Sequence, residues 1–139
     1  MKFFAVVALG ASLLMGSVVQ AQDADLMAEA QSAAEQWLAL TDSADYAAGW
    51  EQASGLFKAA ISKEDWEKAI QAVRAPLGAV KSRKLKLSRY ATSLPGAPDG
   101  EYVVIQFETE FENKASAIET VTPLKDKDGS WRVSGYFVK

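Results

Sequence analysis

The side chains that most often carry out chemistry in proteins are scarce in this sequence. Its 139 residues include no histidine and no cysteine. Histidine is the most common general base and a frequent metal ligand, and cysteine is a frequent nucleophile. Their absence excludes Ser-His and Cys-His nucleophilic catalysis, and it argues against zinc, copper or iron sites built from side chains. We therefore expect no metal and no cofactor.

Carboxylates are the remaining candidates for general acid–base chemistry, so their position relative to the core matters. In the strand pattern expected for residues 101–139, Glu108, Glu110 and Glu119 fall on the face opposite the apolar side chains. Asp126 and Asp128 resemble the start of a calcium loop, but the later ligands are missing, so we assign them to a hairpin turn. We therefore expect no catalytic residue.

A binding site is the second possibility. Arg83 has the same strand parity as Leu85 and Leu87, so it is expected to point inward, where it needs an anionic or carbonyl partner. Together with aromatic side chains it could bind a small apolar or mixed ligand. The candidate ligand-binding residues are Arg83, Trp50, Trp66, Phe107, Thr120 and Phe137. The alternative, which we favour, is that the aromatic side chains fill the core completely.

These residues must be positioned by strands at the end of the chain. Residues 103–111 alternate between apolar and polar side chains, as a strand with one buried face does. Turns are expected at residues 113–114 and at 128–129, where Asp-Gly is a strong hairpin signal. With two-residue turns, Phe107 would face Thr120 and then Phe137. On the same register, Val103 would face Leu124 and then Val133.

Helices are expected before the strands. Residues 23–40 carry apolar side chains at helical spacing, and residues 46–57 carry a second apolar stripe weakened by two glycines. Ser62 begins a capping motif for a third helix, and Pro76 should end or kink that helix around residues 74–75. Residues 79–94 read as a strand rich in Lys and Arg. We interpret it as an edge strand protected by charge, with a basic patch for an anionic partner as the alternative.

The predicted fold class is therefore α+β, with three N-terminal helices packed on a curved four-stranded antiparallel sheet. Residues 1–21 read as a signal peptide: Lys2 precedes an apolar run that ends at a typical cleavage site, Val19-Gln20-Ala21. An uncleaved anchor is the alternative. Residues 22–139 would form one domain. We expect a soluble periplasmic protein that is not a lipoprotein, because no cysteine is present for lipid attachment.

The outward face of the expected sheet is the third candidate surface. It would carry aromatic and β-branched residues with an arginine, a composition typical of protein interfaces. The candidate interface residues are Tyr102, Val104, Val121, Arg132 and Tyr136. We expect a homodimer through this face. The formal net charge of −3 gives no sign of nucleic-acid binding, and no membrane contact is expected after signal cleavage.

Five motifs resemble one known family. They are Arg74-Ala-Pro-Leu-Gly, Ser82-Arg-Lys-Leu, Leu94-Pro-Gly-Ala-Pro-Asp-Gly-Glu-Tyr, Glu119-Thr-Val-Thr-Pro and Trp131-Arg-Val-Ser-Gly-Tyr. In this order they resemble the exported bacterial family called domain of unknown function 4019. The order of elements is also similar to the nuclear-transport-factor-2-like, or cystatin-like, cone. The resemblance implies an exported protein and transfers no catalytic residue.

The resulting functional hypothesis is a non-catalytic binding or assembly module of the bacterial periplasm. Its partner would be a small apolar ligand, an envelope protein or a second copy of the chain. One alternative is a small-molecule carrier with its ligand in the cavity of the cone. Another is an isomerase- or dehydratase-like enzyme, which would require a carboxylate inside that cavity.

Overall fold

The computed structural model describes residues 13–139, so the first 12 residues of the predicted signal peptide lie outside the described part. Four helices are followed by four strands. They are α1 (Leu13–Asp42), α2 (Tyr46–Gln52), α3 (Gly55–Ala60), α4 (Lys63–Leu77), β1 (Val80–Ala91), β2 (Tyr102–Phe111), β3 (Lys114–Lys125) and β4 (Trp131–Val138). The predicted α+β class and the four antiparallel strands are confirmed, with four helices in place of the expected three.

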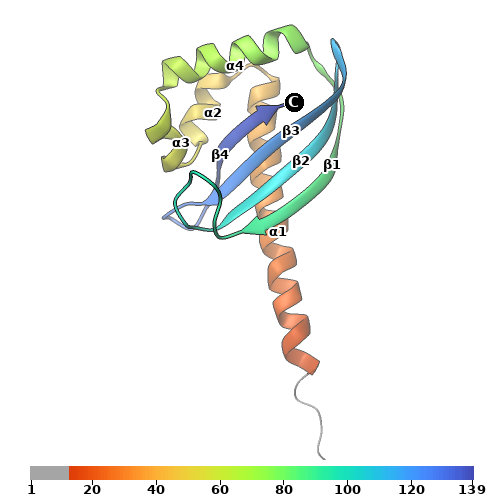
Figure 1. The fold of residues 1–139 in the computed structure, drawn as a ribbon, viewed down its shortest axis with the longest axis vertical. Helices are drawn as coiled ribbons and strands as arrows, with labels where there is room; N and C mark the ends of the chain where they lie inside the picture. The colour runs from red at the N-terminus through yellow and green to blue at the C-terminus, as the bar shows by residue number, and fades with distance from the viewer. Residues whose placement is uncertain (1–12) are drawn as a thin grey trace, which may run out of the picture.

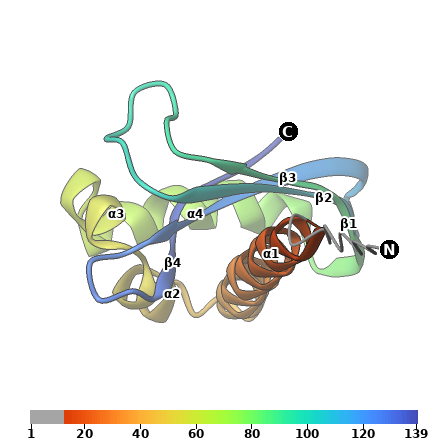
Figure 2. The ribbon, with the colours of Figure 1, turned by 90° about the horizontal axis from the view of Figure 1, so that it is seen from below.

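The strands form one antiparallel sheet in the order β1-β2-β3-β4, so β1 and β4 are its edges. The sheet bends around α1, whose N-terminal turns extend beyond it (Figure 1). The helices gather on one side of the sheet, which we call the inner face, and the β1–β2 loop projects from the other side (Figure 2). No helix in the described part of the chain is long and apolar enough to cross a membrane.

Aromatic side chains fill the space between the helices and the inner face. The Trp37 ring lies 5.9 Å from that of Trp66 and 5.2 Å from that of Tyr136, and Phe57 meets Trp66 edge-on at 4.8 Å. The Trp37 indole N–H donates to the Gly49 carbonyl at 2.9 Å, so the polar end of this buried ring is satisfied. The interior is therefore a packed aromatic core.

The turn between β2 and β3 differs from the prediction by one residue. The ladder closes with Phe111 opposite Lys114, which places Glu112 and Asn113 in the turn. A bulge near Thr109 then sets the register of the remaining pairs, in which Phe107 faces Glu119. The shifted turn alone would keep the expected faces, because it changes each cross-strand partner by two residues. The bulge adds one residue, and because side chains alternate between faces, it moves the side chains of β3 beyond the bulge to the opposite face from the one expected.

The physical cause of this turn lies in α4. The Asn113 backbone N–H donates to the Leu77 carbonyl at 2.9 Å, and the Asn113 side-chain amide donates to the Pro76 carbonyl at 3.0 Å. These bonds satisfy carbonyl groups that the end of a helix leaves free. Gly78, at φ 76°, is required here, since a Cβ at this residue would lie 3.0 Å from the Glu112 Cβ.

A second bulge changes the face of the side chains along β4. Pro123 has no N–H to donate and lies in a central strand, a position that proline takes only with a local irregularity. The ladder skips Ser134 at this point, and the Ser134 hydroxyl donates to the Thr122 carbonyl at 2.8 Å. Thr120 faces Phe137 as predicted, but Val133 faces Pro123. Tyr136 therefore points inward and Phe137 outward.

The helices also differ in detail from the prediction. The expected helix at residues 46–57 is broken between α2 and α3, because the Ser54 backbone N–H donates to the Val133 carbonyl of β4. The Ser54 hydroxyl then caps α3 by accepting from the Phe57 N–H. Ser62 caps α4 as predicted. That helix continues to Leu77 with Pro76 in its last turn, beyond the end expected around residues 74–75.

Candidate functional site

Glu119 of β3 lies at the centre of a polar cluster on the inner face, although the sequence pattern placed it on the outer one. Its side chain is fully buried. Arg83 of β1 donates from Nε to Oε1 at 2.7 Å and from Nη2 to Oε2 at 3.1 Å. The Thr109 hydroxyl donates to Oε1 and the Tyr136 hydroxyl to Oε2. Four hydrogen bonds thus converge on one carboxylate.

Arg83 also pairs with a second carboxylate, at the end of α1. Its Nη1 and Nη2 lie 2.7 and 2.9 Å from the Asp42 oxygens. Arg74 of α4 donates to Asp42 Oδ1 at 2.8 Å. The result is an alternating chain of charges, Glu119–Arg83–Asp42–Arg74, which we call the charge chain. It connects β3, β1, α1 and α4, and its formal charges cancel.

The cluster also shifts the protonation equilibria of its members. Burial alone would raise the pKa of Asp42, but hydrogen bonds from Arg83 and Arg74 and their charges hold that pKa below its usual value. Burial alone would lower the pKa of Arg83, and its bonds to Asp42 and Glu119 raise it instead. Burial, the Glu119 charge and the hydrogen bond to Glu119 raise the pKa of Tyr136. All three groups therefore keep their usual charge states at neutral pH.

This arrangement limits what the cluster can do chemically. A carboxylate has about four acceptor positions, and Glu119 uses them all within the protein. It therefore has no free position from which to accept a substrate proton. Arg83 uses four of its five N–H donors on Glu119 and Asp42, so little remains for an external anion. The inward orientation and internal anionic partner expected for Arg83 are confirmed.

The other side chains of the ligand hypothesis are divided between two faces. Trp66 and Phe107 belong to the packed core, where both are buried. The Trp50 indole donates to the Ile61 carbonyl at 2.9 Å. Thr120 lies on the outer face beside Gln106, so the expectation that it points inward with Phe107 is wrong. Phe137 is 58% exposed, and the expectation that it points inward is also wrong.

Trp66 and Phe137 nevertheless border the same depression, which we call the α4–β4 groove. Its volume is about 250 Å³. It is lined by Trp66, Ala69, Ile70 and Val73 from α4 and by Tyr136, Phe137 and Val138 from β4. These residues are apolar except for the indole N–H of Trp66 and the hydroxyl of Tyr136. Val73 is 44% exposed at the rim of the groove. The buried Trp66 indole N–H has no hydrogen-bond partner, which is unusual for a buried donor.

The candidate interface residues do not share one face either. Val121 and Tyr136 belong on the inner face, Val121 fully buried and Tyr136 packed on Trp37, because of the register and the bulge described above. Tyr102 is buried, and its hydroxyl donates to the Pro98 carbonyl at 2.6 Å. The Arg132 side chain bonds to Ser130 and Asp128 within its own hairpin. Val104 remains half-buried on the outer face.

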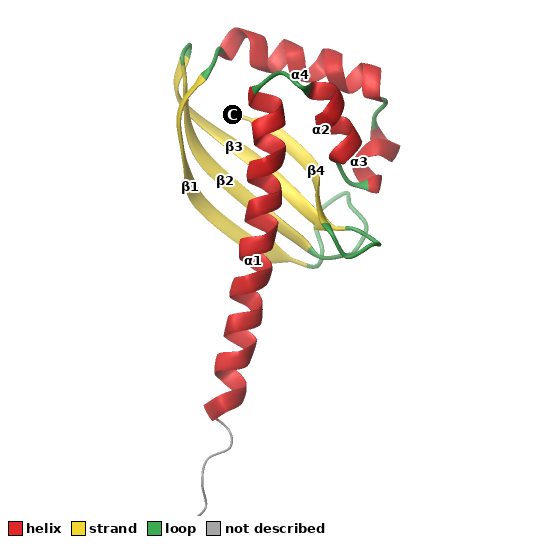
Figure 3. Cartoon of the chain, turned by 180° about the vertical axis from the view of Figure 1, so that it is seen from behind, coloured by secondary structure: helices red, strands yellow, loops and turns green. Residues whose placement is uncertain are grey.

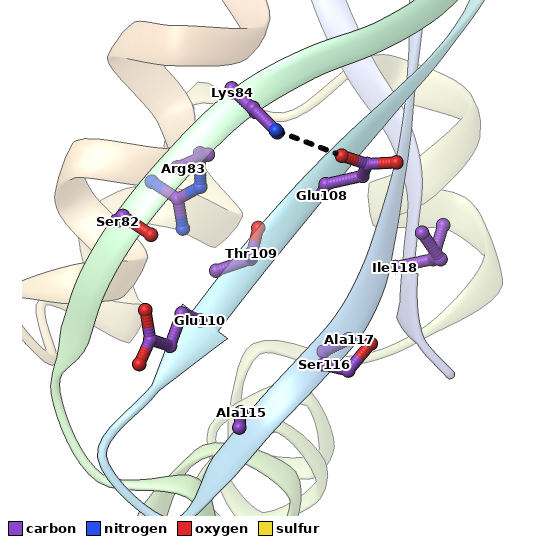
Figure 4. Close-up of a pocket in the computed structure, with 10 residues that line it drawn as sticks. All are labelled: Ser82, Arg83, Lys84, Glu108, Thr109, Glu110, Ala115, Ser116, Ala117 and Ile118. Carbon is purple, nitrogen blue, oxygen red and sulfur yellow. Dashed lines mark ion pairs between the residues drawn. The ribbon is translucent and has the colours of Figure 1, made fainter.

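A second, more polar depression crosses β1, β2 and β3. Figure 4 shows the residues that line it, including Lys84 and Glu108, which pair across neighbouring strands at 3.5 Å. Both side chains are largely exposed, so their ion pair contributes little. The rest of the lining combines small side chains with larger ones: Ser82, Arg83, Thr109, Glu110, Ala115, Ser116, Ala117 and Ile118. Asp126, in the turn between β3 and β4, accepts a hydrogen bond from the Gly55 backbone N–H at 3.0 Å.

Replacing Glu119 tests whether the cluster is structural. In Glu119→Gln the neutral amide cannot balance the positive charge of Arg83. Its NH₂ group, a hydrogen-bond donor, also replaces a carboxylate oxygen that accepts from two donors in the wild type. Removing one partner of a buried ion pair costs about 3 to 5 kcal/mol. Urea denaturation should show this loss of unfolding free energy. Glu108→Gln, in an exposed pair, is the matched control and should behave like the wild type. Equal midpoints for both variants would refute a structural role for Glu119.

The pKa of Asp42 gives a second prediction. Because this pKa is depressed in the folded state, the stabilising contribution is present above the unfolded value, about 3.9, and is lost as pH falls below it. Unfolding free energy, measured by urea denaturation between about pH 5 and pH 3, should therefore fall more steeply for the wild type than for Asp42→Asn. Asp99→Asn, in an exposed loop, should keep the wild-type slope. Parallel curves for the wild type and Asp42→Asn would contradict the assignment.

Comparison with known proteins gives one match. The family model described as "Protein of unknown function (DUF4019)" matches residues 33–136, which include the three helices after α1, the last part of α1 and almost the whole sheet. No curated protein and no solved structure matches the chain. The matched region contains every residue of the charge chain and the α4–β4 groove apart from Phe137 and Val138. The chain belongs to the DUF4019 family.

Proposed function

We propose that this protein is a non-catalytic binding module of the bacterial periplasm and that the α4–β4 groove is its binding site. The groove is the observation that carries the proposal. It combines a concave apolar lining with two large exposed apolar side chains, Val73 and Phe137. Concave apolar surfaces with a few polar groups are where proteins bind apolar ligands. The signal-peptide pattern of residues 1–21 supports export.

A non-catalytic role is supported by the saturation of Glu119. Of the carboxylates in the described part of the chain, Glu119 is the one that is buried on the inner face. An isomerase- or dehydratase-like reaction needs a base within reach of a substrate. Glu119 is held by Arg83, Thr109 and Tyr136 in the position where such a base would lie. The cluster thus fits a structural role better than a catalytic one.

The bent sheet closed by helices on one side supports a cone of the nuclear-transport-factor-2-like type (Figure 3). Trp37, Phe57, Trp66 and Tyr136 occupy the interior of this cone. This packing argues against a carrier with its ligand deep inside the cone, and it favours binding at the cone's rim, where the groove lies.

The outer face of the sheet supports a second proposal, a homodimer. No helix covers this face in the described part of the chain (Figure 2). Thr120 lies near its middle, opposite Gln106, and Val104 lies near the start of β2. Apolar Leu87 and Phe137 lie toward its two edges, each more than 40% exposed. A second copy would cover these side chains. Charged residues at the margin, such as the Lys84–Glu108 pair, would form the polar rim of such an interface.

An uncharged fluorescent probe tests the groove. N-phenyl-1-naphthylamine should bind the wild-type protein with a rise in fluorescence. Val73→Lys places a charge at the rim of the groove without altering the buried core, and should weaken binding about tenfold, or about 1.4 kcal/mol. Leu85→Lys is the matched control because Leu85, on β1, is 44% exposed, as Val73 is. The groove is not the binding site if Val73→Lys binds the probe as tightly as the wild type does.

Val104→Glu tests the dimer. A carboxylate at this position on the outer face would be buried without a partner in a dimer, so the variant should be a monomer at concentrations where the wild type is dimeric. Light scattering after size exclusion measures the mass, and Asp99→Asn serves as the surface control. A monomeric wild type, or an unchanged mass for Val104→Glu, would remove the support for this interface.

A further inference from the structure

The two edges of the sheet differ in charge. The β1 edge carries Lys81, Lys84, Lys86 and Arg89, all exposed. Between Arg132 and Lys139, the β4 edge carries no charged residue. Proteins commonly protect an open edge against another strand with lysine or arginine, because a charged side chain resists burial between two strands. By this criterion β1 is closed to a further strand, whereas the second half of β4 is open to an uncharged one.

The backbone groups of β4 fit the same interpretation. Lys139 and Ile118 exchange both backbone hydrogen bonds. Since the groups of an antiparallel strand alternate in direction, those of Phe137 and Lys139 face β3, and those of Tyr136 and Val138 face the open edge. Nearer the start of β4, the Val133 carbonyl is already taken by the Ser54 N–H. The free edge is therefore limited to the segment that borders the α4–β4 groove.

We propose that an extended, uncharged peptide segment of a partner protein binds in the α4–β4 groove as a fifth strand on β4. This proposal rests on the proposed function and names the ligand of that site. A groove between an edge strand and a helix is a known geometry for peptide capture, in which the backbone supplies hydrogen bonds and pockets select alternate side chains. Here Tyr136 and Val138 supply the backbone groups. Trp66, Ile70 and Val73 form the pocket for an apolar side chain.

The complementarity between site and partner is one of charge and hydrogen bonding. The free segment of β4 and the groove lining contain no ionised side chain, so a charged residue entering the groove would lose its hydration without gaining a partner. The Trp66 ring lines the groove and offers an apolar surface, while its indole N–H is buried without a partner. The uncharged lining together with the free backbone groups of β4 favours an uncharged segment in strand conformation over a helix or a charged tail.

The test is selection from a displayed library of fully randomised seven-residue peptides against the wild-type protein. Enriched peptides should carry uncharged apolar residues at alternate positions, and should bind Val73→Lys about tenfold more weakly than the wild type. Leu85→Lys should bind them normally. With the synthetic peptide bound, hydrogen exchange measured by NMR should slow at the Tyr136 and Val138 amides, and the Trp66 indole signal should shift.

Two outcomes would overturn the proposal while leaving the apolar groove intact. One is that N-phenyl-1-naphthylamine binds as described above, yet the library yields no peptide enriched over the Val73→Lys control. The other is that enriched peptides keep their affinity when every second backbone nitrogen is methylated, whether the methylated set is the odd-numbered or the even-numbered residues. In that case side chains alone bind and no strand is added. If the fluorescent probe also fails to bind, the proposed function fails together with this inference.

Discussion

The charge chain from Glu119 through Arg83 and Asp42 to Arg74 is the interaction on which the rest of the structure depends. It connects the first and the last helix, α1 and α4, to the central strand β3 and to the edge strand β1. Buried charges are tolerated only when they are paired and hydrogen-bonded, so each member requires the others to be in place. Arg74 meets this constraint in part: it donates from Nη2 to Asp42 and its guanidinium lies over the Phe111 ring, with Cζ 5.0 Å from the ring centroid, while its buried Nε and Nη1 have no hydrogen-bond partner. Helix, turn and sheet are thereby fixed in one arrangement.

This constraint also explains why the side chains that hold the fold together are not available for contact with another molecule. The polar groups that could have carried out chemistry are used to hold α1, α4, β1 and β3 together. The aromatic residues are used in the same way, because Trp37, Phe57 and Trp66 fill the interior. What remains available to another molecule lies at the periphery: the outer face of the sheet, the free part of the β4 edge and the groove beside α4. These surfaces are the ones on which the proposal of a binding role rests.

The groove itself follows from the way the helices are anchored. The C-terminal end of α4 is held by Asn113 and by the Arg74–Asp42 pair, and its N-terminal end is held through Trp66 against Phe57. Between these anchors, the helix borders β4 without closing on it, and Val73 and Phe137 stay exposed. Apolar side chains that remain exposed beside one another commonly mark interaction sites. The position of the groove is thus a consequence of the two anchors.

The sequence by itself determined the α+β class, the existence of the strands, the Ser62 cap, the edge position of β1 and the need of Arg83 for an anionic partner. These features depend on local periodicity and on the cost of burying a charge, both of which can be read from residue types. The tertiary structure decided the register. Asn113 caps the end of α4 and moves the turn by one residue, and the bulge between Thr109 and Phe111 then brings Glu119 inside and sends Thr120 outward. The bulge opposite Pro123 then exchanges Tyr136 and Phe137. A strand has a period of two residues, so one extra residue at a bulge is enough to change its face, and the local sequence pattern does not record where that bulge lies.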